Sequence, residues 1–145
     1  MIDHFVHFVD EAAARANPVM GAYWVEGDDL GPGAWRGDVV IPALSVYQVT
    51  GTETVTDPET GVSYQRELRE YYAGWFATVA LADLDDGLRS LSWIVADRTA
   101  AEAGESNFVL YLSPELSGTD LDSVKVSPLF AGANYPFHRA APYWR

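Results

Sequence analysis

Two seven-residue segments of similar sequence, Asp10–Ala16 and Asp97–Ala103, constrain the fold more than any other part of this chain. Each begins with aspartate, whose carboxylate can accept hydrogen bonds from the free N–H groups of a first helical turn, and continues with alanines, the strongest helix formers. Each is followed by a residue typical of helix ends, Asn17 or Gly104, which is expected to adopt a left-handed conformation. The segments therefore predict two short capped helices.

Apolar runs flank both segments, which predicts a strand, a short helix and a second strand in each case. Helices of under three turns are marginal alone, so these are expected to pack on a sheet. The predicted class is α+β, with a mixed or antiparallel sheet, two similar strand-helix-strand units in a ferredoxin-like element, and an inserted long β-hairpin. Only four of the seven positions are identical, so a chance similarity is the alternative. The apolar runs are Phe5–Val9, Met20–Val25, Trp93–Ala96 and Phe108–Leu112.

The long hairpin is predicted between the two units. Leu44–Thr56 is rich in β-branched and aromatic residues, which favour strands. Asp57–Gly61 has the composition of a hairpin turn, because its proline fixes φ and Gly61 permits the positive φ of a bulged turn. The return strand is expected over residues 62–70. Before the hairpin, Glu26–Gly37 is rich in Gly, Pro and Asp and is predicted as a long loop.

The domain organisation follows from length and composition. Residues 1–127 are predicted to form one α+β domain, because 145 residues suit a single core. Residues 128–145 mix aromatics, prolines and arginines without a period, and form a tail that is either draped over the domain or projecting. The apolar runs fall short of the roughly 20 residues that span a bilayer, so membrane insertion is not expected.

The charge of the chain disfavours several classes of partner. The formal net charge is −12, from 9 basic and 21 acidic residues. Such a surface repels phosphate backbones and anionic membranes, so nucleic acid is not an expected partner. The chain has no cysteine, which excludes disulfides, thiolate metal sites and a cysteine nucleophile.

The chain contains no residue pattern that indicates catalysis. His4 and His7 are three apart in a predicted strand, so they face opposite sides and cannot share a metal ion. Asp83, Asp85 and Asp86 lack the spacing of a calcium loop and are interpreted as turn or helix N-terminal residues. Phosphate-binding loops and serine nucleophile elbows are missing from the sequence. The chain is therefore predicted not to be an enzyme and to hold no cofactor or metal. A hydrolase built from scattered carboxylates and a histidine is the remaining enzymatic alternative.

Aromatic residues outside the predicted strands are the best candidates for partner binding. One lies in the predicted loop, and the others lie with arginines in the tail. Exposed aromatics beside arginine suit an anchor in a protein interface or a platform for a sugar ring. A tail folded over its own domain is the alternative reading. The predicted partner-binding residues are Trp35, Tyr135, Phe137, Arg139, Tyr143 and Trp144.

Four short segments carry a resemblance to a group of phage proteins: His4–Ala12 (HFVHFVDEA), Asp57–Gly61 (DPETG), Gly74–Val79 (GWFATV) and Val126–Pro128 (VSP). They resemble small uncharacterised proteins encoded beside tail-fibre genes in phages and prophages of alphaproteobacteria. The longer second half and the aromatic tail depart from the shorter members of that group. The resemblance implies a virion- or tail-associated protein without an assigned activity.

The leading hypothesis is a structural or interaction protein of a phage virion, associated with the tail or capsid and made in the bacterial cytoplasm. In that role the hairpin or the tail would contact other virion proteins or other copies of the chain. The alternative is a domain that binds a carbohydrate or small ligand, such as a host surface glycan, through Trp35 and the tail aromatics.

Overall fold

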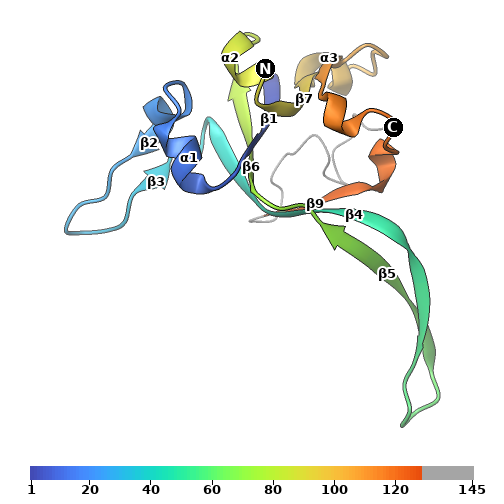
Figure 1. Ribbon diagram of the computed structural model, residues 1–145. Helices are drawn as coiled ribbons and strands as arrows, with labels where there is room; N and C mark the ends of the chain where they lie inside the picture. Colours follow the sequence, from blue (N-terminus) through green and yellow to red (C-terminus); the bar gives the residue numbers. More distant parts are fainter. Residues whose placement is uncertain (129–145) are drawn as a thin grey trace.

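The computed structural model describes residues 1–128 as a curled antiparallel sheet with a few short helices (Figure 1). The main sheet has the order β5-β4-β6-β1-β7-β8, with β9 paired to β4, and β2 and β3 form a separate two-stranded sheet. All pairings between the described strands are antiparallel, which confirms a mostly β form of the α+β class. The strands are β1 Ile2–Phe8, β2 Trp24–Val25, β3 Ala34–Trp35, β4 Val40–Thr56, β5 Ser63–Tyr71, β6 Trp75–Leu81, β7 Ser92–Asp97, β8 Val109–Leu112 and β9 Val124–Pro128.

Aspartates begin the short helices, as the sequence predicts. The Oδ1 atom of Asp10 accepts from the N–H of Ala13 at 2.8 Å, and that of Asp97 accepts from the N–H of Ala100 at 3.1 Å. Asp85 caps the helix between these two, Asp86–Arg89, in the same way. This agrees with its interpretation as a helix N-terminal residue. The helices are α1 Glu11–Ala16, α2 Asp86–Arg89 and α3 Arg98–Glu102, and the 3-10 helices are η1 Met20–Tyr23, η2 Pro114–Leu116 and η3 Leu121–Ser123.

The C-terminal ends of α1 and α3 differ in backbone conformation. Gly104 has a φ of 78°, the left-handed conformation that its sequence position predicts. The same prediction for Asn17 is wrong, because its φ is −68° and its ψ is 132°. Asn17 precedes Pro18, whose ring restricts the preceding residue to extended conformations. The Asn17 side chain instead accepts from the N–H groups of Val19 and Met20, at 2.9 and 3.1 Å, where η1 begins.

The two predicted strand-helix-strand units differ in their last strand. After α3, β8 returns beside β7. After α1, the expected strand Met20–Val25 begins as the 3-10 helix η1, and the short β2 pairs with β3 rather than with β1. The central strands lie in the order β4-β6-β1-β7, with α1 between β1 and β4 in sequence and α2 between β6 and β7. This gives a β-α-β-β-α-β connectivity in which α2, rather than α3, is the second helix.

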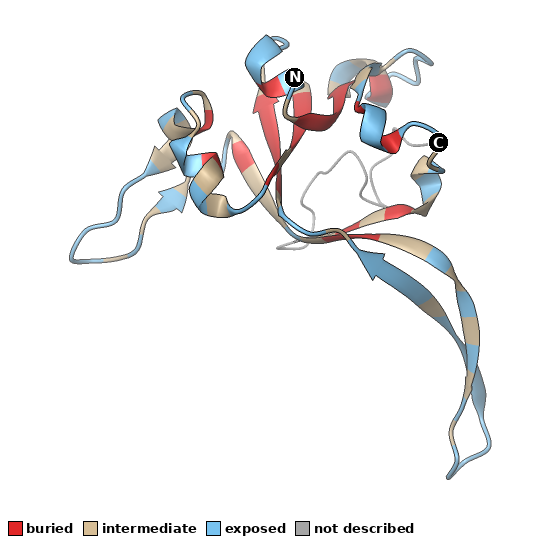
Figure 2. Cartoon of the chain, in the orientation of Figure 1, coloured by how far each residue is buried: buried red, intermediate tan, exposed pale blue. Residues whose placement is uncertain are grey.

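Apolar side chains cover both faces of the central strands. Figure 2 shows that the buried residues lie in the body of the molecule. Successive residues of β1 point to opposite faces, so Val6 joins the cluster under α1 and α2, whereas Phe5 joins the cluster under β9 and η2. The first cluster comprises Val6, Phe8, Ala14, Met20, Val40, Ala77, Val79 and Leu88. The second comprises Phe5, Val46, Phe76, Trp93, Ile94, Leu116, Val124 and Val126.

A long two-stranded ribbon leaves the body of the molecule (Figure 1). Strand β4 is one continuous strand of 17 residues, whose first part pairs with β6 and whose last part pairs with β5. The turn matches its prediction, because Gly61 has a φ of 72° and its N–H donates to the carbonyl of Asp57 at 2.8 Å. Residues 49–69, beyond the pairing of β4 with β9, are called the arm below.

Candidate functional site

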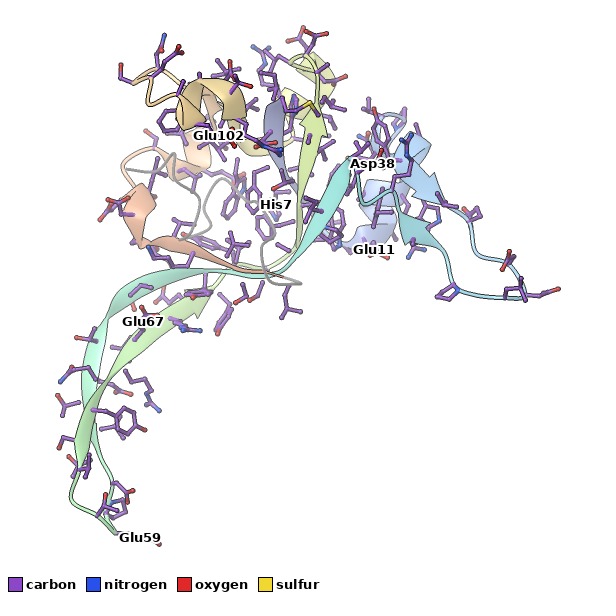
Figure 3. The ribbon with its side chains drawn as sticks, turned by 180° about the vertical axis from the view of Figure 1, so that it is seen from behind. His7, Glu11, Asp38, Glu59, Glu67 and Glu102 are labelled. Carbon is purple, nitrogen blue, oxygen red and sulfur yellow. The ribbon has the colours of Figure 1, made fainter. Side chains whose placement is uncertain are left out.

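A cavity of about 520 Å³ opens between α1, the β2–β3 hairpin and the first residues of β4 and β6. Three partly buried tryptophans line it, and it is called the tryptophan pocket below. In Figure 3, Glu11 and Asp38 lie on this side of the molecule, away from Glu59 and Glu67 on the arm. The lining residues are Glu11, Arg15, Trp24, Gly33, Ala34, Trp35, Gly37, Val40, Pro42, Ala43, Leu44 and Trp75.

The pairing of β2 with β3 sets two of these tryptophans side by side. Trp24 and Trp35 are direct partners in the register, so their side chains share one face. Their ring centroids lie 5.2 Å apart at an interplanar angle of 74°, and Trp75 lies 5.3 Å from Trp35. The prediction of a loop over all of Glu26–Gly37 is therefore wrong at Ala34–Trp35, because strand pairing resumes after the turn.

Helix α1 places a charged pair beside the tryptophans, with Arg15 over the Trp24 ring. Glu11 and Arg15 are four residues apart, so they lie one above the other on the helix and form an ion pair. The Arg15 Cζ atom lies 3.8 Å from the centroid of the Trp24 ring, a cation–π contact. The side chains of Arg15 and Glu11 are 45% and 39% exposed. The pocket therefore presents both a hydrogen-bond donor and an acceptor to solvent.

Glycines allow the loop before β3 to lie against Trp24. A Cβ atom at Gly33 would come within 2.4 Å of the Trp24 ring, and one at Gly27 within 2.6 Å of the Gly33 backbone nitrogen. Asp28 begins the intervening turn, because its Oδ1 atom accepts from the N–H of Gly31 at 3.1 Å. The wall of the pocket beside Trp24 thus depends on positions without side chains.

The back of the pocket is fixed by packing. Trp35 and Trp75 rest against the core cluster under α1 and α2. The indole N–H of Trp35 is buried, and it has no hydrogen-bond partner in the part of the chain that the structure describes. A buried unpaired donor destabilises a fold by about 1–3 kcal/mol. Packing against the core therefore fixes the Trp35 and Trp75 rings, although the unpaired indole N–H lowers the stability of the fold.

The arm forms a second candidate surface, because its residues are exposed or only partly buried (Figure 2). On one face, Val55 lies opposite Tyr64, and Leu68 lies opposite a glycine. Tyr64 is 54% exposed and Leu68 is 39% exposed. Between them, Arg66 and Glu53 form an ion pair across the strands. The arm therefore presents two apolar side chains on either side of a charged pair.

The opposite face of the arm is polar. The Nε2 atom of Gln65 donates to the Thr54 hydroxyl at 2.7 Å, and the hydroxyls of Thr56 and Ser63 lie 2.9 Å apart. Exposed polar contacts of this kind contribute little, and a two-stranded hairpin without a core is marginal in water. The arm consequently gains little stability from its own side chains.

The two described histidines make structural contacts. His4 is buried, its Nδ1 atom lies 3.1 Å from the Val79 carbonyl oxygen, and its Nε2 atom accepts from the N–H of Asp85 at 3.0 Å. Burial lowers the pKa of His4. The Nε2 atom of His7 lies 3.0 Å from the Ala73 carbonyl oxygen. Residues 1–128 contain no group of three or more His, Asp or Glu residues arranged to hold a metal ion.

The structure describes one of the predicted partner-binding residues. Trp35 lies in the tryptophan pocket, where it contacts Trp24 and Trp75. Sequence reasoning missed these two tryptophans and the Glu11–Arg15 pair, although the spacing of that pair on a predicted helix was a usable signal. The remaining predicted residues lie outside the described part of the chain: Tyr135, Phe137, Arg139, Tyr143 and Trp144.

The helices of residues 1–128 do not include one with the length and apolar character that crossing a membrane requires. Comparisons with protein-family models, with curated proteins and with solved structures find no match to this chain.

Proposed function

We propose that this chain is a non-enzymatic interaction protein of a phage virion, associated with the tail or capsid, that binds neighbouring virion proteins or other copies of itself. The observation that carries the proposal is the arm, which projects from the body (Figure 1) and whose residues are exposed or only partly buried. Ordering the backbone costs about 1–2 kcal/mol per residue, and the arm has little packing to offset that cost. Burial of the arm against a partner provides the missing contacts. The virion setting rests on the resemblance carried by segments such as Asp57–Gly61.

The face that carries Tyr64 and Leu68 is the proposed contact surface. Both side chains are exposed, at 54% and 39%, and stand on the same face, because they are four residues apart in one strand. Tyrosine is enriched among the residues that anchor protein interfaces. The Arg66–Glu53 pair between them supplies charges of both signs, which favours a partner surface with complementary charges.

Virions purified from the bacterial strain that carries the gene provide the first test. Mass spectrometry is expected to detect the chain in intact particles, and chemical cross-linking is expected to join the arm to a neighbouring subunit. Absence of the chain from intact virions would contradict the proposal.

A pair of double variants tests the role of the arm. Tyr64→Ser with Leu68→Ser is expected to reduce incorporation into virions at least about tenfold, because interface anchors each contribute more than about 1 kcal/mol. Thr52→Ala with Gln65→Ala changes the opposite face and serves as the matched control. Circular dichroism is expected to show the same fold for both. Equal incorporation of the two double variants would rule out the Tyr64 face as the contact.

A further inference from the structure

We propose that the tryptophan pocket is a binding site for a neutral saccharide. The pocket is formed by α1, β2, β3 and the first residues of β4 and β6, so it is separate from the arm and does not depend on the function proposed for the arm. Three features carry the inference: the tryptophan walls, the Glu11–Arg15 pair that lines the pocket with them, and the charge of the chain as a whole.

The size and walls of the pocket suit a small ligand. Its volume of about 520 Å³ lies within the range of small-molecule sites, which are about 300–1,000 Å³ and mostly apolar. Trp35 and Trp75 are held from behind by the core, so their positions do not have to be ordered by the ligand. Trp24 stands edge-to-face against Trp35 and is fixed in turn by the loop at Gly33. These indoles give a pre-organised apolar wall.

The polar groups that line the pocket match the hydroxyls of a sugar. A saccharide has an apolar C–H face that can lie against an aromatic ring, and hydroxyls that both donate and accept hydrogen bonds. Arg15 supplies donors and Glu11 supplies acceptors, and both line the pocket. The contacts of Arg15 with the Trp24 ring and with Glu11 hold the guanidinium in place before a ligand arrives. A guanidinium has five N–H donors, so a single ion pair does not exhaust it.

The same groups argue against other ligand classes. An anionic ligand would be repelled by the Glu11 carboxylate and by the net charge of −12 on the chain. A cationic ligand would be repelled by the Arg15 guanidinium, which lines the pocket and lies against the Trp24 ring. A wholly apolar ligand would remove water from the Glu11–Arg15 pair without replacing its hydrogen bonds, which is unfavourable. A neutral ligand that carries both an apolar face and hydroxyls fits all of these constraints.

Isothermal titration calorimetry with the full chain tests the proposal. The probes are neutral trisaccharides of glucose, of galactose and of N-acetylglucosamine, with trigalacturonic acid and choline as the anionic and cationic comparisons. We expect at least one neutral trisaccharide to bind with a Kd of about 1 mM or tighter. Failure of all three neutral probes to bind, or binding of the anionic or cationic probe alone, would overturn the proposal.

Variants then locate the site. Trp24→Ala is expected to weaken the binding of that saccharide at least about tenfold, whereas Trp24→Phe, which keeps an aromatic ring, is expected to retain most of it. Trp24 is outside both core clusters, so its replacement is expected to preserve the fold, as circular dichroism can show. Tyr64→Ala removes an aromatic side chain from the arm and is the matched control. Equal affinity of Trp24→Ala and the unchanged chain would place any saccharide site elsewhere and refute the assignment.

Discussion

Protonation of His4 is expected to destabilise the fold below neutral pH. The ring is fully buried in β1, and the tautomer with its proton on Nδ1 satisfies both contacts, donating to the Val79 carbonyl and accepting from the Asp85 N–H. A second proton, on Nε2, would face that N–H, so two donors would oppose each other. Burial lowers the pKa of His4 below its ordinary value of 6.5, although the hydrogen bonds to the backbone of Val79 and Ile2 and, to a smaller extent, the carboxylates of Asp85 and Asp3 act in the opposite direction.

The direction of the pKa shift sets the direction of the stability change. Because the folded chain has the lower pKa, the unfolded chain binds the proton first as the pH falls. The stability contributed by neutral His4 is therefore present above pH 6.5 and is lost progressively below it, towards the folded-state pKa. One proton gives a slope of at most about 1.4 kcal/mol per pH unit. Between about pH 7.5 and pH 5.5, the loss due to His4 has an upper limit of about 1.4 kcal/mol.

Urea unfolding at these two pH values measures the loss, in a window where most carboxylates stay ionised. His4→Gln is expected to be less stable than the unchanged chain at the higher pH, but to lose less stability on acidification. Leu30→Ala, at a site that is 96% exposed and without a titratable group, is the control and is expected to keep the pH dependence. The reasoning fails if His4→Gln and the unchanged chain lose equal stability, or if NMR titration gives His4 a pKa of 6.5 or above.

Two pairs of substitutions test the packing. Leu88→Ala removes a fully buried side chain and is expected to lower the free energy of unfolding by about 2–5 kcal/mol in urea titrations, whereas Leu30→Ala, at a site that is 96% exposed, is expected to change it by about 0.5 kcal/mol or less. Gly33→Ala is expected to alter the near-ultraviolet circular dichroism of the tryptophans, because its Cβ would come within 2.4 Å of the Trp24 ring. Gly37→Ala meets no atom within 4 Å and should leave that spectrum unchanged. Equal effects within either pair would contradict this packing.

Features that depend on a few neighbouring residues were predictable from the sequence. The caps at Asp10 and Asp97 and the left-handed Gly61 and Gly104 follow from contacts or conformations within one turn of chain. Asn17 shows the limit of such reasoning, because two local preferences compete there and the restriction from the following proline prevails. The α+β class was predictable for the same reason, since it depends on where strands and short helices begin and end.

The tryptophan pocket was only partly predictable, because segments distant in the sequence form it. Trp35 was identified as a candidate from its place in a Gly/Pro-rich segment. Its partner Trp24 stands opposite only because the intervening loop folds back on itself, which requires the close approach at Gly33. Trp75 joins them from β6, whose position depends on pairing with β1 and β4. Periodicity in a single sequence carries no information about these long-range pairings.

Strand β4 connects the two candidate surfaces. Its first residues, including Val40 and Leu44, line the pocket, and its last residues form the arm. Figures 1 and 3 show the β2–β3 hairpin and the arm on different sides of the body, so the pocket and the arm are separate surfaces. Variants of the arm should therefore leave saccharide binding unchanged, and Trp24→Ala should leave virion incorporation unchanged. Loss of both properties in one variant would indicate damage to β4 itself rather than to either surface.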